Sequence, residues 1–204
     1  MGRVTCDMAM SLDGFVAGPN QSLENPLGED IEERLHNWMW AGDPGDAEAI
    51  DKITAAGAFI MGRNMFGPVR GSWDSWESEW RGWWGEDPPY HAPVFVLTHH
   101  PRAPLEMQGG TSFTFVTDGI ESALERAHDA AGEADVAVAG GAATVRAYLN
   151  AGLIDELRLH VTPAIVGAGE RLLDGVHGVR LEQQGALGTR SVTHLTYRAE
   201  KIGA

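Results

Sequence analysis

The sequence predicts an α/β protein with a mixed, mostly parallel central sheet and helices on both faces. Segments typical of strands and of helices alternate over most of the 204 residues, as they do where crossover helices join parallel strands. An apolar fraction of 43% with 26 glycines suits such a fold, and neither repeats nor linkers divide the chain. We therefore expect a single domain over residues 1–204, with a tryptophan-rich insertion at about 71–90.

The first half of the chain supplies two expected strands and two expected helices. The strands are expected at residues 4–12 and 58–61, and residues 15–17 with a turn follow the first of them. Residues 29–41 have helical spacing, with Ile31, Leu35 and Trp38 on one face. A second helix is expected to run to residue 53, with Asp46 as its N-cap.

The second half continues the alternation and begins with a helix-start signal. Asp118 and Glu121 resemble a capping box for a helix through residue 131. A further helix follows Gly140-Gly141 and stops at Gly152. Strands are expected at 93–98, 111–117, 136–139, 157–161 and 192–197.

Five of the seven tryptophans lie in the expected insertion. They occur at helical spacing, with Ser72 as a possible cap, and they are Trp73, Trp76, Trp80, Trp83 and Trp84. They could form an aromatic wall over a substrate, or a stripe that packs against the domain or a second subunit. Stripes at helical spacing are more typical of packing.

The net charge limits which binding partners we expect, and the cysteine content limits the cellular compartment. A net charge of −14 argues against nucleic acids and anionic membranes as partners. The single cysteine, Cys6, excludes an intramolecular disulfide and is expected to be a small core residue. There is neither a signal peptide pattern nor an apolar run of the ~20 residues that span a bilayer, so we expect a cytoplasmic protein.

Three expected strand ends carry residues suited to binding an anion. Arg63 and Asn64 follow one strand, residues 98–102 follow another, and Gly140-Gly141 follows a third. In an open α/β sheet, ligands bind beyond the carboxyl ends of the strands. Within so acidic a protein, Arg63, His99, His100 and Arg102 at these ends suggest a ligand with several phosphates.

The strand, glycine pair and helix start at residues 136–149 are the most informative of these ends. Glycines let a ligand approach the backbone, and the N–H groups and dipole of a helix start favour an anion. A plain tight turn is the alternative. The glycine pattern is not the dinucleotide-binding Gly-x-Gly-x-x-Gly, and the histidines lack metal-ligand spacing, so we expect no metal site.

Several motifs together resemble one family. They are residues 10–18 (MSLDGFVAG), 61–66 (MGRNMF), 96–99 (VLTH), 139–142 (AGGA), 153–157 (LIDEL) and 167–173 (GAGERLL). The chain is similar to the dihydrofolate reductase-like proteins related to the reductase domain of the bifunctional riboflavin-biosynthesis enzyme (the RibD C-terminal domain). That resemblance implies a three-layer fold, a homodimer, and NADPH lying across the carboxyl edge of the sheet.

The same resemblance assigns cofactor roles. Gly62 and Arg63, with Asn64, would face the phosphates; Thr98, His99, His100 and Arg102 would hold the adenosine 2′-phosphate; and Gly140, Gly141, Ala142 and Thr144 would hold the pyrophosphate. Ala9, Val16 and Ala17 would border the nicotinamide.

Candidates for catalysis and substrate binding are fewer. Asp13 opens the loop over the nicotinamide, and Glu32 and His36 flank the apolar stripe of the first helix, so these three are the candidate catalytic residues. Phe66, Trp38 and Trp73 are the candidate substrate contacts.

We therefore expect an NADPH-dependent reductase that transfers a hydride to a small heterocyclic or carbonyl/imine substrate, of a pterin-like or riboflavin-precursor-like class. The alternatives are a flavin, quinone or nitro reductase on the same scaffold, and an NADPH-binding sensor without turnover.

Overall fold

The computed structural model describes residues 1–29, 31–67, 71–75 and 80–202, and these residues build one large sheet. Within them, nine strands follow the order β10-β11-β8-β1-β7-β3-β4-β6-β5, while β2 pairs with β9 separately. The strands are β1 (Val4–Ser11), β2 (Phe15–Ala17), β3 (Ala58–Gly62), β4 (Pro93–Leu97), β5 (Leu105–Glu106), β6 (Ser112–Val116), β7 (Val136–Gly140), β8 (Glu156–Thr162), β9 (Glu170–Arg171), β10 (Val179–Gly188) and β11 (Thr193–Lys201).

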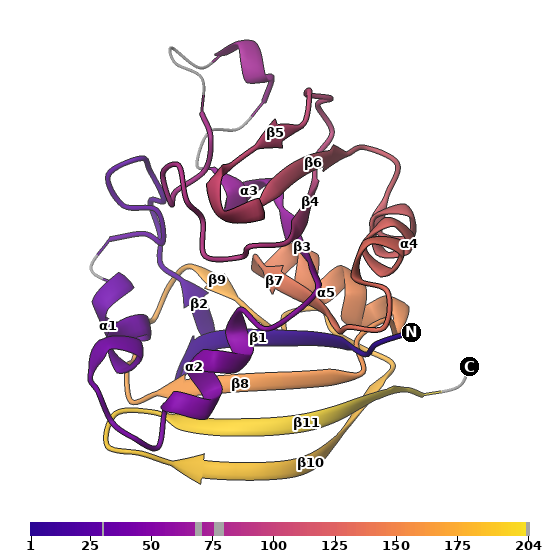
Figure 1. Cartoon of the computed structure of the whole chain (residues 1–204). Helices are drawn as coiled ribbons and strands as arrows, with labels where there is room; N and C mark the ends of the chain where they lie inside the picture. The colour runs from indigo at the N-terminus through magenta and orange to yellow at the C-terminus, as the bar shows by residue number, and fades with distance from the viewer. Residues whose placement is uncertain (30, 68–70, 76–79, 203–204) are drawn as a thin grey trace.

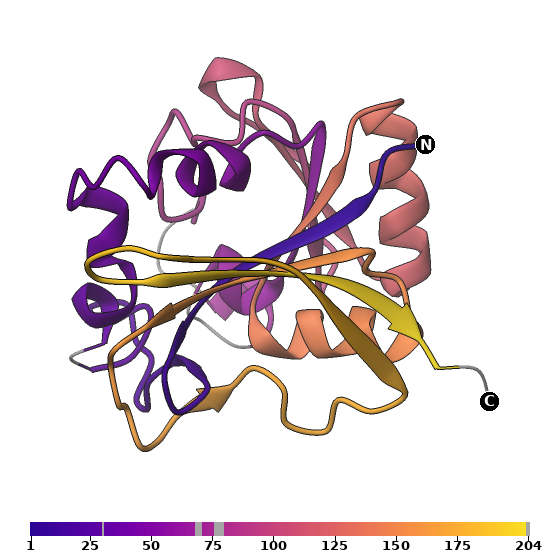
Figure 2. The ribbon, with the colours of Figure 1, turned by 90° about the horizontal axis from the view of Figure 1, so that it is seen from below.

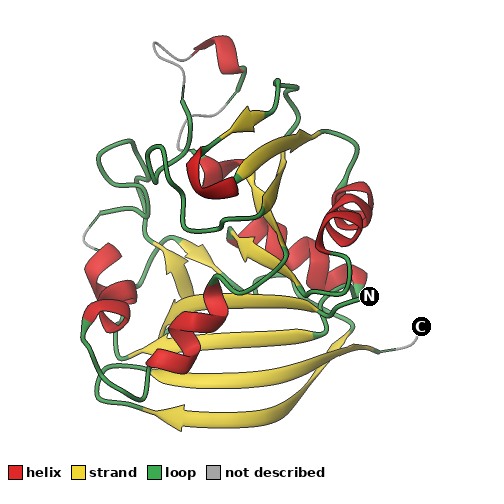
Figure 3. Cartoon of the chain, viewed as in Figure 1, coloured by secondary structure: helices red, strands yellow, loops and turns green. Residues whose placement is uncertain are grey.

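The pairing confirms a mixed, mostly parallel sheet. All neighbouring strands from β8 to β6 pair in parallel. At one edge β11 pairs antiparallel with β8 and β10 pairs antiparallel with β11, and at the other edge β5 pairs antiparallel with β6. The carboxyl ends of β8, β1, β7, β3 and β4 consequently lie along one edge of the sheet (Figure 3).

Helices cover both faces of this sheet (Figures 1 and 2). The longer helices α4 and α5 pack against β3, β4 and β7. On the opposite face, α1 and η1 lie over β1 and β8, and α2 follows them. The helices are α1 (Glu32–His36), η1 (Asn37–Trp40), α2 (Ala47–Ile53), α3 (Arg63–Phe66), η2 (Trp73–Ser75), η3 (Gln108–Gly110), α4 (Ile120–Ala131) and α5 (Ala142–Ala151).

The main core lies between the sheet and the helices α4 and α5. Side chains alternate across each strand, so Val4 and Cys6 of β1 face Val145 and Tyr148 of α5 in this core, while Asp7 belongs to the other face. Burying each such apolar side chain stabilises the fold by roughly 1.5–3 kcal/mol. Cys6 is fully buried, and burial raises the pKa of its thiol, which confirms it as a core residue.

A second core on the opposite face explains the tryptophan-rich insertion. Phe59, Phe66 and Phe113 form its centre, and Trp73 and Trp80 pack against them. Of the described insertion residues, 73–75 form the 3₁₀ turn η2 and 80–90 form loops and turns, so the expected continuous helix is absent there. Trp76 lies outside the described residues. The packing interpretation of the stripe therefore fits Trp73 and Trp80.

Of two expected helix caps, Asp46 is confirmed in position but not in its capping bond, and Asp118 is wrong. Asp46 occupies the N-cap position of α2, but its side chain makes no capping hydrogen bond and reaches His194 instead. Gly119 is the N-cap of α4, and Asp118 accepts hydrogen bonds from Ser122 and Arg126. The sequence marks a polar residue at each helix start and cannot show that a partner elsewhere in the fold takes its side chain.

The helix expected at 29–41 is shorter than predicted, and the strand β10 was not predicted from the sequence. The described residues begin α1 only at Glu32, and the chain tightens to the 3₁₀ helix η1 after His36. β10 has almost no buried side chain, so it lacks the alternation that predicts a strand, and it forms by pairing with β11. None of the helices in the described ranges is long and apolar enough to cross a membrane.

Candidate functional site

The ends of β3 and β7 meet at the carboxyl edge of the sheet. The two strands are neighbours, and β3 ends at Gly62 while β7 ends at Gly140. A Cβ built on Gly62 would lie well inside 3.0 Å of the Thr144 hydroxyl, in the first turn of α5. Only glycine therefore lets the β3 end approach α5 this closely.

The glycine pair at the start of α5 leaves its backbone accessible. Gly140 has a φ of 119°, and its peptide bond to Gly141 is cis. Gly141 is the N-cap of α5, and a Cβ built there would meet nothing within 4 Å. The first-turn N–H groups of an α-helix have no partner within the helix, so this open face suits an anion.

Two arginines that follow the ends of β3 and β4 contact the ring of Trp73. The Arg63 guanidinium lies over the Trp73 ring, 3.1 Å from its centroid, and the Arg102 guanidinium lies 4.9 Å from the same centroid. The indole N–H donates to the His100 carbonyl at 2.8 Å, and the Thr98 hydroxyl accepts from the His100 N–H at 3.1 Å. Cation–π contact and these hydrogen bonds fix the loop after β4 against α3.

The remaining predicted cofactor residues differ in exposure. Asn64 and His99 are exposed, Ala9 of β1 is half-buried, and Ala142 and Thr144 are buried in the first turn of α5. Val16 and Ala17 are buried in β2, and Val16 packs into the main core, which leaves little of either side chain for a ligand.

Asp13 has a clear structural role among the candidate catalytic residues. Desolvation raises the pKa of its carboxyl, but hydrogen bonds from the Ser11 hydroxyl and from the N–H groups of Val166 and Gly167 outweigh that effect and lower the pKa to about 2. Asp13 is therefore ionised at neutral pH and does not suit the role of proton donor.

The other two candidates lie on α1. Glu32 is its first residue, and its side chain is not part of the described structure; His36 is its last and is half-buried.

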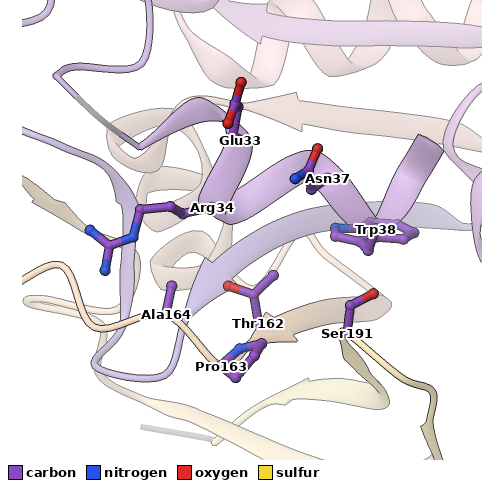
Figure 4. A pocket seen from close by; sticks show the side chains of 8 residues that line it. All are labelled: Glu33, Arg34, Asn37, Trp38, Thr162, Pro163, Ala164 and Ser191. Carbon is purple, nitrogen blue, oxygen red and sulfur yellow. The ribbon is translucent and has the colours of Figure 1, made fainter. Parts of the chain in front are cut away.

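The substrate candidates Phe66 and Trp38 are both almost fully buried. Phe66 is 1% exposed and packs on Phe113, Phe115 and Trp73, so it is a core residue rather than a substrate wall. Trp38 is also 1% exposed, but it borders a cavity of about 320 Å³ between α1, η1 and the end of β8 (Figure 4). The cavity is lined by Glu33, Arg34, Asn37, Trp38, Thr162, Pro163, Ala164 and Ser191.

Comparison with known sequences identifies the family. A family described as the RibD C-terminal domain matches residues 3–195. The chain belongs to this family. A relative in Bacillus subtilis (strain 168), the uncharacterized protein YyaP, is 23% identical over 174 residues, which cover 83% of this chain and 79% of YyaP.

Solved structures agree with that membership. A putative riboflavin biosynthesis protein from Shewanella sp. PV-4 matches with a TM-score of 0.64 and 21% identity, covering 98% of this chain and 99% of that one. Dihydrofolate reductase from Enterococcus faecalis, solved with NADP(H), matches with a TM-score of 0.57 and 14% identity over 97% and 96% of the two chains. The fold of this RibD C-terminal domain is thus dihydrofolate reductase-like, as the sequence resemblance implied.

This RibD C-terminal domain also contains a buried polar network that was not predicted from the sequence. It joins Asp7, Arg158, His160, His194 and Asp46 on the face of the sheet beneath Trp38. A signal was present in β8, where Arg158 and His160 alternate with Leu157, Leu159 and Val161 and so share one face. Polar residues that alternate with core residues in a central strand indicate a polar layer inside the fold.

Proposed function

We propose that the protein is an NADPH-dependent reductase that transfers a hydride to a small heterocyclic or carbonyl/imine substrate. Membership in the RibD C-terminal domain family supports a reductase-type function. The observation that carries the proposal is the approach of Gly62 to Thr144, which brings two glycine-bearing strand ends and a helix N-terminus together at one edge of the sheet.

The residues at this edge fit a dinucleotide with an extra phosphate. The open face of Gly141 suits a pyrophosphate, because backbone N–H groups can approach it without a side chain in the way. Arg63 follows β3 and suits the cofactor phosphates, while His99 and Arg102 follow the neighbouring strand β4 and suit a ribose phosphate. In a protein with a net charge of −14, this local group of cations favours a ligand with several phosphates.

The nicotinamide would supply the hydride, and the chain would bind and orient both reactants. Trp73 holds the loop after β4 in place, whereas the Arg63 guanidinium nitrogens are buried over the Trp73 ring and would turn outward to meet a ligand. The cavity beside Trp38 lies at the carboxyl end of β8, along the same edge of the sheet, and offers room for a small substrate.

Calorimetric titration of NADPH and NADH tests the cofactor assignment. We expect NADPH to bind more tightly than NADH. His99→Ala should weaken NADPH binding about tenfold and change NADH binding little, because it removes a contact with the 2′-phosphate that NADH lacks. Arg63→Ala should weaken the binding of both cofactors, because both carry the pyrophosphate. His99 is exposed, so its variant keeps the fold. The matched control is Arg180→Ala on β10, where the arginine pairs with Glu200. Equal binding of both cofactors, or full affinity in both site variants, contradicts the assignment.

Turnover assays separate the reductase from its rivals. NADPH oxidation is followed with pterins, aldehydes and imines, and in parallel with flavins, quinones and nitro compounds. Oxidation with the first group supports the proposal, and oxidation only with the second assigns the alternative chemistry. Tight NADPH binding without turnover on either group identifies a sensor.

A further inference from the structure

Two buried histidines contact each other beneath Trp38. His160 of β8 and His194 of β11 are direct cross-strand partners, and their Nδ1 atoms lie 2.8 Å apart. Their outer nitrogens each face a carboxylate. His194 Nε2 lies 2.9 Å from Asp46 Oδ1, and His160 Nε2 lies 3.4 Å from Asp7 Oδ1. All four side chains are at least nine-tenths buried.

The geometry determines how many protons the two rings hold. A contact between two ring nitrogens at 2.8 Å requires one proton between them. A carboxylate only accepts hydrogen bonds, so the Asp46 contact places a proton on His194 Nε2. His160 Nε2 makes no hydrogen bond within the described residues, and there the negative charge of Asp7, 3.4 Å away, favours the protonated nitrogen. Three protons on two imidazoles amount to one positive charge.

The charged groups around the pair balance that charge. Asp46 precedes α2 and is fully buried, so an ionised carboxylate there needs a cation, which His194 supplies. Asp7 on β1 accepts two hydrogen bonds from Arg158 of β8, and Arg158 also pairs with Glu156 of the same strand. From the remaining packed element, η1, the pair faces the uncharged ring of Trp38.

The Trp38 ring connects this pair to the cavity. Its centroid lies 4.8 Å from that of His160 and 5.1 Å from that of His194. A cation against an indole ring is attracted most strongly where water is excluded. On the cavity side, Trp38 Nε1 and the hydroxyls of Thr162 and Ser191 have no hydrogen-bond partner in the described residues (Figure 4).

We propose that His160 and His194 are positioning residues that share one proton, carry a single positive charge, and fix Trp38 as a wall of the substrate cavity. This inference rests on the proposed reductase function. Because the wall offers one indole N–H and two hydroxyls, the substrate it takes is a small molecule with a hydrogen-bonding edge rather than an apolar one. Loss of the shared proton leaves Asp46 without its cation and releases the indole.

Nuclear magnetic resonance of ¹⁵N-histidine-labelled protein tests the proton count without any ligand. At neutral pH we expect protonated Nε2 atoms on both rings and one proton shared by the two Nδ1 atoms. The Trp38 indole N–H signal should move with pH at the same midpoint as the two rings. An unprotonated Nε2 on either ring, or an indole signal that ignores the histidine transition, overturns the proposal.

Two variants and one control sharpen the result. Asp46→Asn keeps both rings but removes the buried negative charge, so we expect the shared transition to move to lower pH. His160→Gln should abolish the coupled movement of the indole signal. If His160→Gln does not fold, Asp46→Asn alone decides, and an unmoved transition in it overturns the proposal. The matched control His177→Gln, at an exposed histidine, should change nothing.

Kinetics then test the positioning role. With a substrate found by turnover assays, we expect KM to rise about tenfold through the same pH transition while kcat changes less, because the pair acts on the wall and not on the reacting atoms. In Asp46→Asn the rise in KM should occur at lower pH. A KM that does not follow the transition overturns the role. Absence of any turnover by the wild-type protein refutes the proposed function instead, and the resonance measurements still decide the state of the pair.

Discussion

Gly62 is the residue whose size matters most at the candidate site. Because an added Cβ would collide with the Thr144 hydroxyl, we expect Gly62→Ala to lower the free energy of unfolding by about 1–3 kcal/mol and to weaken NADPH binding. Chemical denaturation and calorimetry measure the two effects. The collision is local, so Gly62→Ala/Thr144→Ala should recover most of the lost stability.

Gly188→Ala is the matched control for this substitution. Gly188 also lies in a strand, and a Cβ built there would meet nothing within 4 Å. Equal losses in Gly62→Ala and Gly188→Ala would mean that the Thr144 contact does not constrain the β3 end. Absence of recovery in the double variant would contradict the same point.

At this scale the sequence predicts the glycines of the site better than its aromatic residues. Gly62 and Gly140 follow recognisable strands, so their place at a sheet edge can be derived from the pattern. Phe66 and Trp73 both follow the end of β3 in the sequence, yet Phe66 is a core residue and Trp73 holds Arg63. That difference depends on the packing of Phe66 against the rings of Phe113 and Phe115 in β6, which no local pattern contains.

At the scale of elements, Asp13 ties two turns together. Asp13 lies in the turn between β1 and β2, and its carboxylate accepts hydrogen bonds from Ser11 at the end of β1 and from Val166 and Gly167 in the loop before β9. The folded pKa of about 2 lies below the ordinary value near ~3.9, so this tie stabilises the fold fully above pH ~4 and loses its effect as pH falls toward 2.

Asp13→Asn tests that tie. We expect the variant to be less stable than the wild-type protein at neutral pH, and the difference between them to shrink as pH falls below about 4. Denaturation at a series of pH values measures it. Asp51→Asn, at an exposed position in α2, serves as the control. A difference that is constant from neutral pH to pH 3, or that grows on acidification, would disprove the tie.

Whole elements were predictable where burial leaves a pattern. The buried strands of the central sheet were predicted within a residue or two, since their apolar runs are short and bounded by turns. β10 was not, because a strand exposed along nearly its whole length is held only by its ladder with β11. The capping role of Asp46 failed for a related reason, since His194 lies far away in the sequence.

For the molecule as a whole, the excess of acidic residues predicts a salt dependence. A net charge of −14 on one chain makes the folded surface repel itself, and folding brings those charges closer together. The Debye length falls from about 30 Å at 0.01 M to about 8 Å at 0.15 M ionic strength, so added salt screens this repulsion. We expect the free energy of unfolding at pH 7 to rise over that range, measured by thermal or chemical denaturation.

Sodium chloride and sodium thiocyanate should act alike at these low concentrations, because screening depends on ionic strength and not on the identity of the anion. A fall in stability, or opposite effects of the two salts, would show that the ion pairs at the surface, such as Arg198 with Glu182, outweigh the net repulsion.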